Sequence, residues 1–322
     1  MEYRPLGKTG LSVSILGLGA SPFGNVFGNV EQADADRCIR AALDGGINYL
    51  DVAPFYGLTR AETVLGKALK GVRRDRYLLS TKVGRYGPLD FDFSGERVTA
   101  SVEESLQRLG VSYIDIILCH DIEFGSADQI VGETLPALRT IVDSGKARFV
   151  GFSGLPLTLF PRILDRADHR LVQVILSYCH YTLQDSSLEG YLAYLTSRGV
   201  GIINASPLGM GLLQARRPIA DWHPAPPEVR DACRAAAAFC TEHGVELSDL
   251  ALAFSTARPQ IATTLVGAGS AEEIERNIAA VETTPDPALL ARVRQILEPV
   301  RDRSWGSGRP ENDPLYGGSV PG

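Results

Sequence analysis

The sequence lacks the features that mark membrane proteins and nucleic-acid binders. No apolar run approaches the roughly 18 residues that a membrane-spanning helix needs. The 32 Lys and Arg residues form no block, and 38 Asp and Glu residues outnumber them, which leaves a net charge of −6. Such a charge pattern argues against a sequence-independent hold on nucleic acid or on an anionic membrane, so we expect neither partner.

Cysteine is also scarce. The five cysteines show no C-x-x-C spacing and leave one unpaired, which argues against a disulfide framework. The first residues, MEYRPLGKTG, lack the apolar core of a signal peptide, so we expect a cytoplasmic protein with reduced thiols. Cys233 and Cys240 lie seven residues apart in a helical stretch, which predicts that both face the core.

The sequence does contain a regular alternation of buried strands and amphipathic helices. Apolar runs that predict strands buried on both faces cover residues 13–19, 47–53, 77–83, 114–120, 147–153, 171–178, 199–206 and 262–268. Stretches with helical periodicity include 33–44, 60–70, 94–109, 127–144, 187–198, 228–243 and 270–281. Eight strand-then-helix units predict an α/β fold, a closed (β/α)₈ TIM barrel, with residues 1–322 as a single domain.

Three segments depart from this repeat. YRPLGKTGLSV (3–13) predicts a small N-terminal β-hairpin that closes the bottom of the barrel. The proline-rich stretch 208–227 predicts a long loop after the seventh strand, and residues from about 300 to 322 predict an irregular, partly mobile C-terminal tail.

Four polar residues lie at or just past the carboxyl ends of predicted strands: Asp51, Tyr56, Lys82 and His120. In a parallel barrel these ends converge on one face, where active sites are built. A tyrosine is a poor base at neutral pH, but a neighbouring Lys82 ammonium favours the phenolate and is expected to lower the pKa of Tyr56. With Asp51 holding the lysine and His120 binding the reacting oxygen, the residues predict a proton-transfer site.

The same residues resemble a known family. The run LDVAPFYGLTRAETVLGKALK (50–70) resembles the aldo-keto reductase signature, and Asp51, Tyr56, Lys82 and His120 match that family's catalytic tetrad. The resemblance extends from RPLGKTGLSVS to the ERN near residue 277. Four further segments resemble its aldose 1-dehydrogenase branch: GASPFGNVFG (19–28), FDFSGERV (91–98), CHDIEFGS (119–126) and ILSYCHY (175–181).

The resemblance implies NAD-dependent oxidation of an aldose at C1 to the lactone, with Tyr56 as general base. The sugar would be L-galactose or a relative such as L-fucose or D-arabinose. Two alternatives stay open: an NADPH-dependent aldehyde or ketone reductase of the same fold, and a nucleotide-binding regulatory subunit with little turnover. The sequence gives no sign of the oligomeric state.

The residues expected to hold the nicotinamide carboxamide depart from the family pattern. Members usually have Ser-Asn after the fifth strand, where this chain has Ser153 and Gly154. They have Gln on the sixth strand, where it has Ile175, and we expect Gln173, two positions earlier on the same face, to substitute. The remaining expected cofactor contacts are Ser206, Leu208, Met210, Gly267, Gly269, Glu273 and Asn277.

The segment LVGAGSAEEIERN (265–277) bears on the choice of cofactor. Ser270 and Glu273 predict a capping box at a helix start, where backbone N–H groups suit a phosphate. Because no Lys or Arg lies between 267 and 275, we expect NAD rather than NADP, although Arg276 lies one turn into the helix.

Polar and aromatic residues near the strand ends predict the sugar contacts. The expected substrate residues are Phe23, Phe27, Asp121, His180 and Trp305, with Glu123 a further candidate. Cys119-His120 and Cys179-His180 have the chemistry of zinc ligands, but neighbours on a strand point to opposite faces, so we expect no metal.

Overall fold

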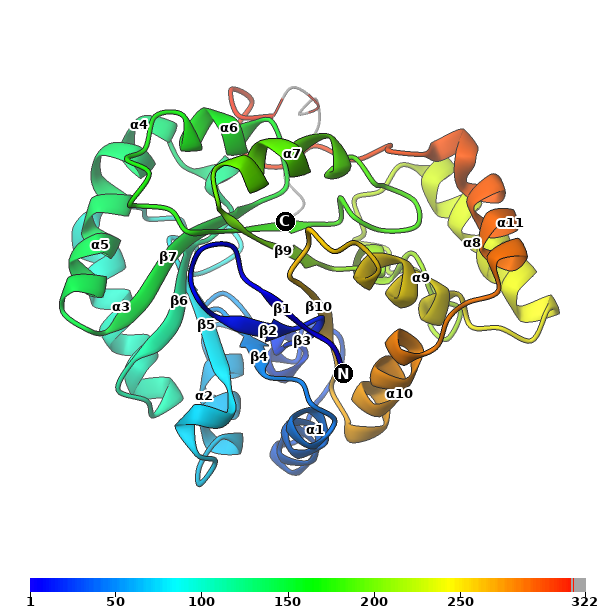
Figure 1. The fold of residues 1–322 in the computed structure, drawn as a ribbon, viewed down its shortest axis with the longest axis horizontal. Coiled ribbons are helices and arrows are strands. Elements are labelled where there is room, and N and C mark those ends of the chain that lie inside the picture. The colour runs from blue at the N-terminus through cyan, green and yellow to red at the C-terminus, as the bar shows by residue number, and fades with distance from the viewer. Residues whose placement is uncertain (314, 316–322) are drawn as a thin grey trace.

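A computed structural model describes residues 1–313 and 315, and it confirms the barrel. Eight parallel strands close in the order β10-β3-β4-β5-β6-β7-β8-β9 (Figure 1). The strands are β3 (Leu16–Gly19), β4 (Tyr49–Asp51), β5 (Leu78–Val83), β6 (Ile114–Cys119), β7 (Ala147–Gly154), β8 (Val174–Tyr178), β9 (Gly201–Ala205) and β10 (Thr263–Gly267). Each lies within or next to one of the predicted runs, because continuous apolar sequence suits strands covered on both faces.

Helices surround this barrel. They are α1 (Gln32–Asp44), α2 (Arg60–Ala68), α3 (Gly95–Leu109), α4 (Ala127–Gln129), α5 (Leu135–Asp143), α6 (Leu159–Leu164), α7 (Glu189–Ser197), α8 (Pro227–Glu242), α9 (Leu247–Thr256), α10 (Ala271–Glu282) and α11 (Pro287–Leu297). A π-helical turn joins α4 to α5, so the predicted helix 127–144 is nearly continuous. Helices α8 and α11 pack together at one side of the molecule (Figure 1).

Three helices are not expected from the periodicity. Helix α6 has only six residues and includes Pro161. Helix α9 buries residues around most of its circumference, so it lacks the clear polar face that marks an amphipathic helix. Helix α11 begins at the Asp286 cap, whose side chain accepts a hydrogen bond from Ala288 N–H.

The N-terminal hairpin closes the amino end of the barrel, as expected. Strands β1 (Tyr3–Pro5) and β2 (Ser12–Ser14) pair antiparallel, and Leu6 is fully buried among the residues that fill the barrel. Gly7, with φ +54°, allows this close approach, because a Cβ there would lie 2.3 Å from Gly201 N. The predicted strand 13–19 is therefore divided between the hairpin and β3.

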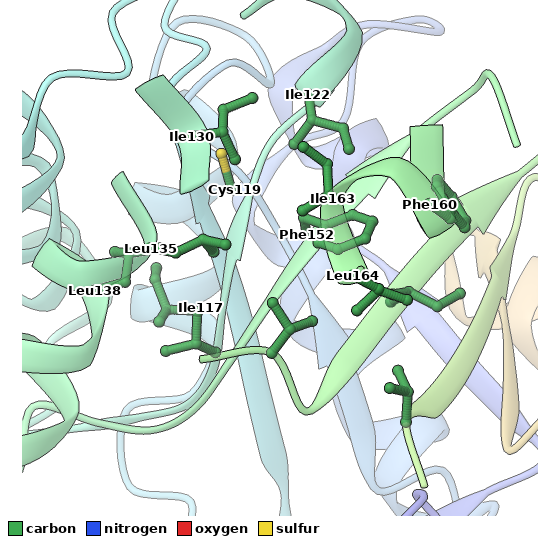
Figure 2. Close-up of a cluster of buried hydrophobic side chains, with 14 of the residues drawn as sticks. Ile117, Cys119, Ile122, Ile130, Leu135, Leu138, Phe152, Phe160, Ile163 and Leu164 are labelled. Carbon is green, nitrogen blue, oxygen red and sulfur yellow. The ribbon is translucent and has the colours of Figure 1, made fainter. Parts of the chain in front are cut away.

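The core has two layers, one inside the barrel and one between the barrel and its helices. Figure 2 shows part of the outer layer, where Ile117 and Phe152 of the barrel meet Leu135, Leu138 and Ile163 of the helices. All five cysteines are free and buried, which confirms the prediction for Cys233 and Cys240. Over residues 1–313 and 315, no helix has both the length and the apolar character to cross a membrane.

The C-terminal segment is irregular, as predicted, but its described part is docked on the barrel. After a final 3-10 turn at Glu298–Val300 it has no helix or strand up to residue 313. Asn312 and Asp313 are each only 4% exposed, so the end of this described stretch is packed against the rest of the protein. The rest of the predicted tail, residues 314 and 316–322, lies outside the described residues.

Candidate active site

Three strand ends bring the four predicted catalytic residues together. Asp51 ends β4, Lys82 lies near the end of β5, and His120 directly follows β6. Tyr56 reaches back from the loop after β4, with its backbone N–H donating to Ala53 O at 3.1 Å. The four side chains converge at the carboxyl end of the barrel, as the parallel register requires.

Lys82 is the centre of this group. Its Nζ donates to Asp51 Oδ1 at 2.5 Å, to Val52 O at 3.0 Å and to Tyr56 Oη at 3.2 Å. Ser80 Oγ donates to the second oxygen of Asp51 at 2.6 Å. Lys82 is 1% exposed and Asp51 3%, so the pair interacts in a weakly screened environment. The contacts fix the ammonium against the phenol oxygen.

The electrostatics of Tyr56 differ from the sequence expectation. Burial raises the pKa of Tyr56, and the Lys82 ammonium, although it acts in the opposite direction, does not fully offset this. Burial also acts to lower the pKa of Lys82, but Asp51 and Tyr56 outweigh it, so the pKa of Lys82 is raised. In the protein alone the site therefore holds a neutral phenol beside a firmly charged lysine.

His120 is neutral and partly unpartnered. Burial lowers its pKa to about 3. Its ring lies edge-on to the ring of Tyr56, with centroids 5.7 Å apart. Within residues 1–313 and 315, Nδ1 has no hydrogen-bond partner, and Nε2 lies 3.6 Å from Asp121 Oδ2. A neutral imidazole beside the phenol can donate one N–H to an oxygen placed between the two rings.

Asp121, a predicted substrate residue, forms an ion pair that the sequence did not indicate. Arg85 Nη1 donates to Asp121 Oδ2 at 2.6 Å, and the Arg85 guanidinium lies 3.8 Å from the ring centre of Phe55. Although burial favours the protonated acid, His120 and Arg85 hold the pKa of Asp121 below its usual range. The position of Arg85, three residues past Lys82 on the same strand end, was the available signal.

The remaining substrate candidates fall into different environments. Phe23 is fully buried against α1 and α2, which corrects its assignment as a substrate contact. Phe27 is 44% exposed and lies 6.3 Å from Trp222 between ring centres. His180 is held within its own loop, with Nδ1 3.0 Å from Asp185 Oδ2. Trp305, on the C-terminal segment, packs edge-on against His223.

The cofactor candidates separate into two groups. Ser206, Leu208 and Met210 lie in the tight turns after β9, where Ser206 and Met210 both have positive φ. Gly267 ends the neighbouring β10, Gly269 lies just before the start of α10, and Asn277 lies almost two turns into that helix. Ser153 is buried at the end of β7, where its Oγ accepts from Asp121 N–H at 3.0 Å.

Gln173 lies at the opposite end of the barrel. It precedes β8, with its side chain bound to Val150 N–H and Arg170 O. Alternation places it on the face shared with Ile175, but it is at the amino end of the strand. The structure therefore does not bring Gln173 to the site, which corrects the expectation that it replaces the missing Gln.

Glu273 is already engaged. Its Oε2 accepts from Gly269 N–H at 2.8 Å and its Oε1 pairs with Arg217 Nη2 at 2.9 Å. Ser270 Oγ accepts from Glu273 N–H, so the predicted helix cap is present. Arg217 comes from the long loop after β9, and it places a cation at α10 that the residues between 267 and 275 do not supply.

Glu123 occupies the space that the family's Asn would need. A Cβ added at Gly154 would lie 3.0 Å from Glu123 Oε2. The carboxyl is fully buried, and Oε1 accepts from Tyr178 O–H at 3.2 Å and Ser307 O–H at 3.0 Å. The sequence signal for this arrangement was the pairing of Gly154 with a second acid two residues after Asp121.

No metal centre accompanies the tetrad in the part of the chain that the structure describes. There, no three His, Cys, Asp or Glu side chains are grouped so as to hold an ion. Two surface hollows lie elsewhere, one between α1 and α2 and a larger one along α2 and α3, and neither is lined by a tetrad residue. The candidate site is therefore identified by the four tetrad side chains that meet at the barrel mouth, and not by a metal group or by either hollow.

Comparison with known proteins agrees with this geometry. A model of the Aldo/keto reductase family matches residues 15–298. The chain is 50% identical over 318 residues to L-galactose dehydrogenase of Arabidopsis thaliana, covering 97% of this chain and 99% of that protein. It is 30% identical to D-arabinose 1-dehydrogenase of Saccharomyces cerevisiae, covering 87% and 89%.

A solved structure has the same architecture. The holo form of the aldo-keto reductase AKR11C1 from Bacillus halodurans superposes with a TM-score of 0.76 at 29% identity, covering 94% of this chain and 97% of that one. These matches confirm the resemblance that the strand-end motifs indicated.

Proposed function

The chain belongs to the aldo/keto reductase family, and from that premise we propose that it oxidises an aldose at C1 to the lactone with NAD as hydride acceptor. One observation carries the proposal: Lys82 Nζ lies between Asp51 Oδ1 at 2.5 Å and Tyr56 Oη at 3.2 Å. The similarity to two sugar dehydrogenases supports an aldose, with L-galactose the first candidate.

The described residues fit a dinucleotide. The turns after β9 and the start of α10 follow two adjacent strands, β9 and β10, so they lie near each other at the carboxyl end of the barrel. A helix N-terminus suits a phosphate. At the centre of the site, His120 Nδ1 is buried without a partner in the described chain. A bound nicotinamide would supply the hydride acceptor for C1, and we expect Ser153, Ser206 and Gly267 to contact the dinucleotide.

The chain's own residues would manage the proton. His120, neutral and adjacent to Tyr56, would donate its N–H to the oxygen on C1 and hold it near the phenol. Tyr56 would take the hydroxyl proton, and Lys82 would stabilise the phenolate that this requires. Because burial raises the pKa of Tyr56, sugar oxidation should become faster as pH rises.

The experiment is the growth of absorbance at 340 nm with NAD or NADP and a panel of L-galactose, L-fucose, D-arabinose and L-gulose. We expect NADH with at least one of these aldoses. Tyr56→Phe should lower kcat by about 10³-fold or more while NAD binding, followed by calorimetry, stays near that of the wild type. Substantial activity in Tyr56→Phe would contradict the role of the phenol.

A second candidate is carbonyl reduction with NADPH. It is favoured by the neutral phenol, which is a ready proton donor, and by Arg217, a cation near the start of α10. If no sugar yields NADH or NADPH, oxidation of NADPH with aldehydes and ketones decides between the two.

A further inference from the structure

Glu123 is a buried carboxyl that the catalytic site leaves unexplained. It lies in the 3-10 turn Ile122–Phe124 after β6, three residues past His120, and it is fully buried. Over residues 1–313 and 315, its Oε2 has no hydrogen-bond partner, and no Lys or Arg side chain lies within ion-pairing distance of it. The nearby Arg85 pairs with Asp121 instead.

The C-terminal segment covers Glu123 on the side facing away from the barrel. Ser307 Oγ donates to Glu123 Oε1 at 3.0 Å, and Arg309 N–H donates to Glu123 O at 2.9 Å. Asn312 Nδ2 donates to Glu123 O and to Gly125 O, both at 2.8 Å. The C-terminal segment, some 180 residues away along the sequence, is thus hydrogen-bonded to both the side chain and the backbone of Glu123.

Two glycines allow the carboxyl to be enclosed. Gly308 has φ +87°, and a Cβ there would lie 2.5 Å from Glu123 O and 2.6 Å from Glu123 Cβ. On the barrel side, Gly154 leaves room for Oε2 and lies next to Ile122 and Phe160. Both of these belong to the outer core and are labelled in Figure 2. A side chain at either position would displace the carboxyl or the segment that covers it.

Glu123 also touches the site itself. Its Oε1 accepts from the hydroxyl of Tyr178, which ends β8, and from Leu155 N–H after β7. Asp121, which contacts His120 Nε2 at 3.6 Å, lies two residues away on the same turn. The carboxyl therefore connects the C-terminal segment to the side of the barrel mouth that holds His120.

We propose that Glu123, as an uncharged carboxylic acid, is the positioning residue that seats residues 305–313 beside the substrate end of the active site. An acid suits this place better than a carboxylate. The Asp121 carboxylate lies on the same turn, and Asp313 is on the docked segment. Two nearby cations are already paired: Arg85 with Asp121, and Arg309 of the docked segment with Glu311. Tyr178 and Ser307 supply neutral hydroxyls.

The electrostatics agree with this geometry. Burial, reinforced by the Asp121 charge, raises the pKa of Glu123 to about 8. When the segment lifts, water reaches the carboxyl and its pKa returns toward the ordinary value near 4.5. Docking must then weaken as pH rises between about 4.5 and 8, by at most about tenfold per pH unit, and become constant above that range. Tyr178 does not titrate there, because burial raises its pKa well above 10.

Hydrogen exchange tests the seating without relying on any activity. The probe is the protection factor of the amides in 305–313, corrected for the intrinsic rate at pH 5.5, 6.5, 7.5 and 9, with α3 as the internal reference. In the wild-type protein we expect protection to fall from pH 5.5 to about 8 and then level off. Glu123→Gln keeps an oxygen that accepts hydrogen bonds but has no proton to titrate. In this variant the protection should stay constant across the pH range.

A second variant changes the C-terminal segment instead of Glu123. Gly308→Ala leaves Glu123 and the tetrad unchanged, and it should lower protection of 305–313 at every pH, as a collision with Glu123 requires. The same pH dependence in wild type and Glu123→Gln would overturn the proposal, as would full protection of the segment in Gly308→Ala.

The link to the substrate rests on the proposed function and is tested separately. With a sugar that is turned over, Glu123→Ala and Gly308→Ala should raise KM about tenfold or more with a smaller change in kcat, and Glu123→Gln should restore KM. An unchanged KM in both disruptive variants would show that the segment does not border the sugar. If no sugar is turned over, the proposed function fails while the exchange experiment still decides the seating.

Discussion

Two buried carboxyls at the mouth of the barrel have opposite surroundings. Asp51 has an ammonium at 2.5 Å and a hydroxyl on its second oxygen, so it is part of an ion pair. Among the described residues, Glu123 has hydroxyl and amide donors on one oxygen and none on the other, and the neighbouring charge that acts on it is that of another acid, Asp121. Burial disfavours the charged form of both carboxyls, but only Asp51 has a cation beside it that offsets this cost. Similar burial therefore leads to different charge states.

The difference assigns different tasks to the two groups. A charged Asp51 keeps Lys82 charged and directed at Tyr56, so the electrostatics of the site depend on it. A neutral Glu123 holds chain segments together and contributes shape. Replacing each carboxyl by its amide, which removes the charge and keeps the size, separates the two tasks.

Among the carboxyl substitutions, the largest effect is expected for Asp51→Asn. The amide leaves the Lys82 ammonium buried without an anion, a situation that costs about 3–5 kcal/mol unless the lysine releases its proton. Either outcome weakens the support for a Tyr56 phenolate, so kcat for sugar oxidation should fall by about 10²–10⁴-fold. Steady-state kinetics and urea unfolding measure the two losses.

Glu123→Gln is the matched control for that experiment. It removes a carboxyl of similar burial, yet it should keep most of the activity at pH 7, because the wild-type group is already uncharged there. Equal damage from the two amide substitutions would mean that Glu123 acts as an anion, and the contrast between the two carboxyls would be lost.

The next effect concerns stability as a function of pH. In the unfolded chain Glu123 ionises near 4.5, and in the folded protein its pKa is about 8. Between these values the folded protein holds a proton that the unfolded chain has released, so the stability from this group is present at low pH and declines as pH rises to about 8. The decline should not exceed about 1.4 kcal/mol per pH unit.

The measurement is the difference in unfolding free energy between wild type and Glu123→Gln from pH 5 to 9. His120 also titrates on unfolding at low pH, because burial lowers its pKa to about 3, but that contribution is common to both proteins and cancels. The unfolding free energy of wild type minus that of Glu123→Gln should fall steadily with rising pH and become flat above about 8. A constant difference would assign Glu123 an ordinary pKa.

The contrast between the carboxyls also marks the limit of sequence-based prediction. Asp51, Lys82 and His120 were placed correctly because each ends a parallel strand, and the register of such strands brings their carboxyl ends together. Tyr56 followed from the short loop after β4. The Glu123–Ser307 contact, by contrast, spans 184 residues and depends on how two irregular segments fold. Nothing local specifies it except the glycines that make room.

The errors have similar causes. Alternation gave the correct face for Gln173 but said nothing about which end of β8 it occupies, and its side chain is bound at the amino end. The pKa of Tyr56 was expected to fall on account of Lys82, but the degree of burial that outweighs the lysine is a property of the assembled site. Phe23 was placed in the first loop, yet the 3-10 turn Ser21–Gly24 directs it into the core.

The smallest effect is expected at a third carboxyl, which has a cation but lies in water. Glu273 and Arg217 pair at 2.9 Å with side chains 32% and 64% exposed, so the interaction contributes at most about 1 kcal/mol. Glu273→Gln keeps an oxygen that can accept from Gly269 N–H and frees Arg217 for an anion near the start of α10. The ratio of kcat/KM for NADP to that for NAD should rise by no more than about fivefold.

The double variant Glu273→Gln with Arg217→Ala is the control. In it the gain should disappear, because the cation that would meet a 2′-phosphate is gone. A gain that persists without Arg217 would point to Arg276, and no gain in either variant would place the adenosine end of the cofactor away from this pair.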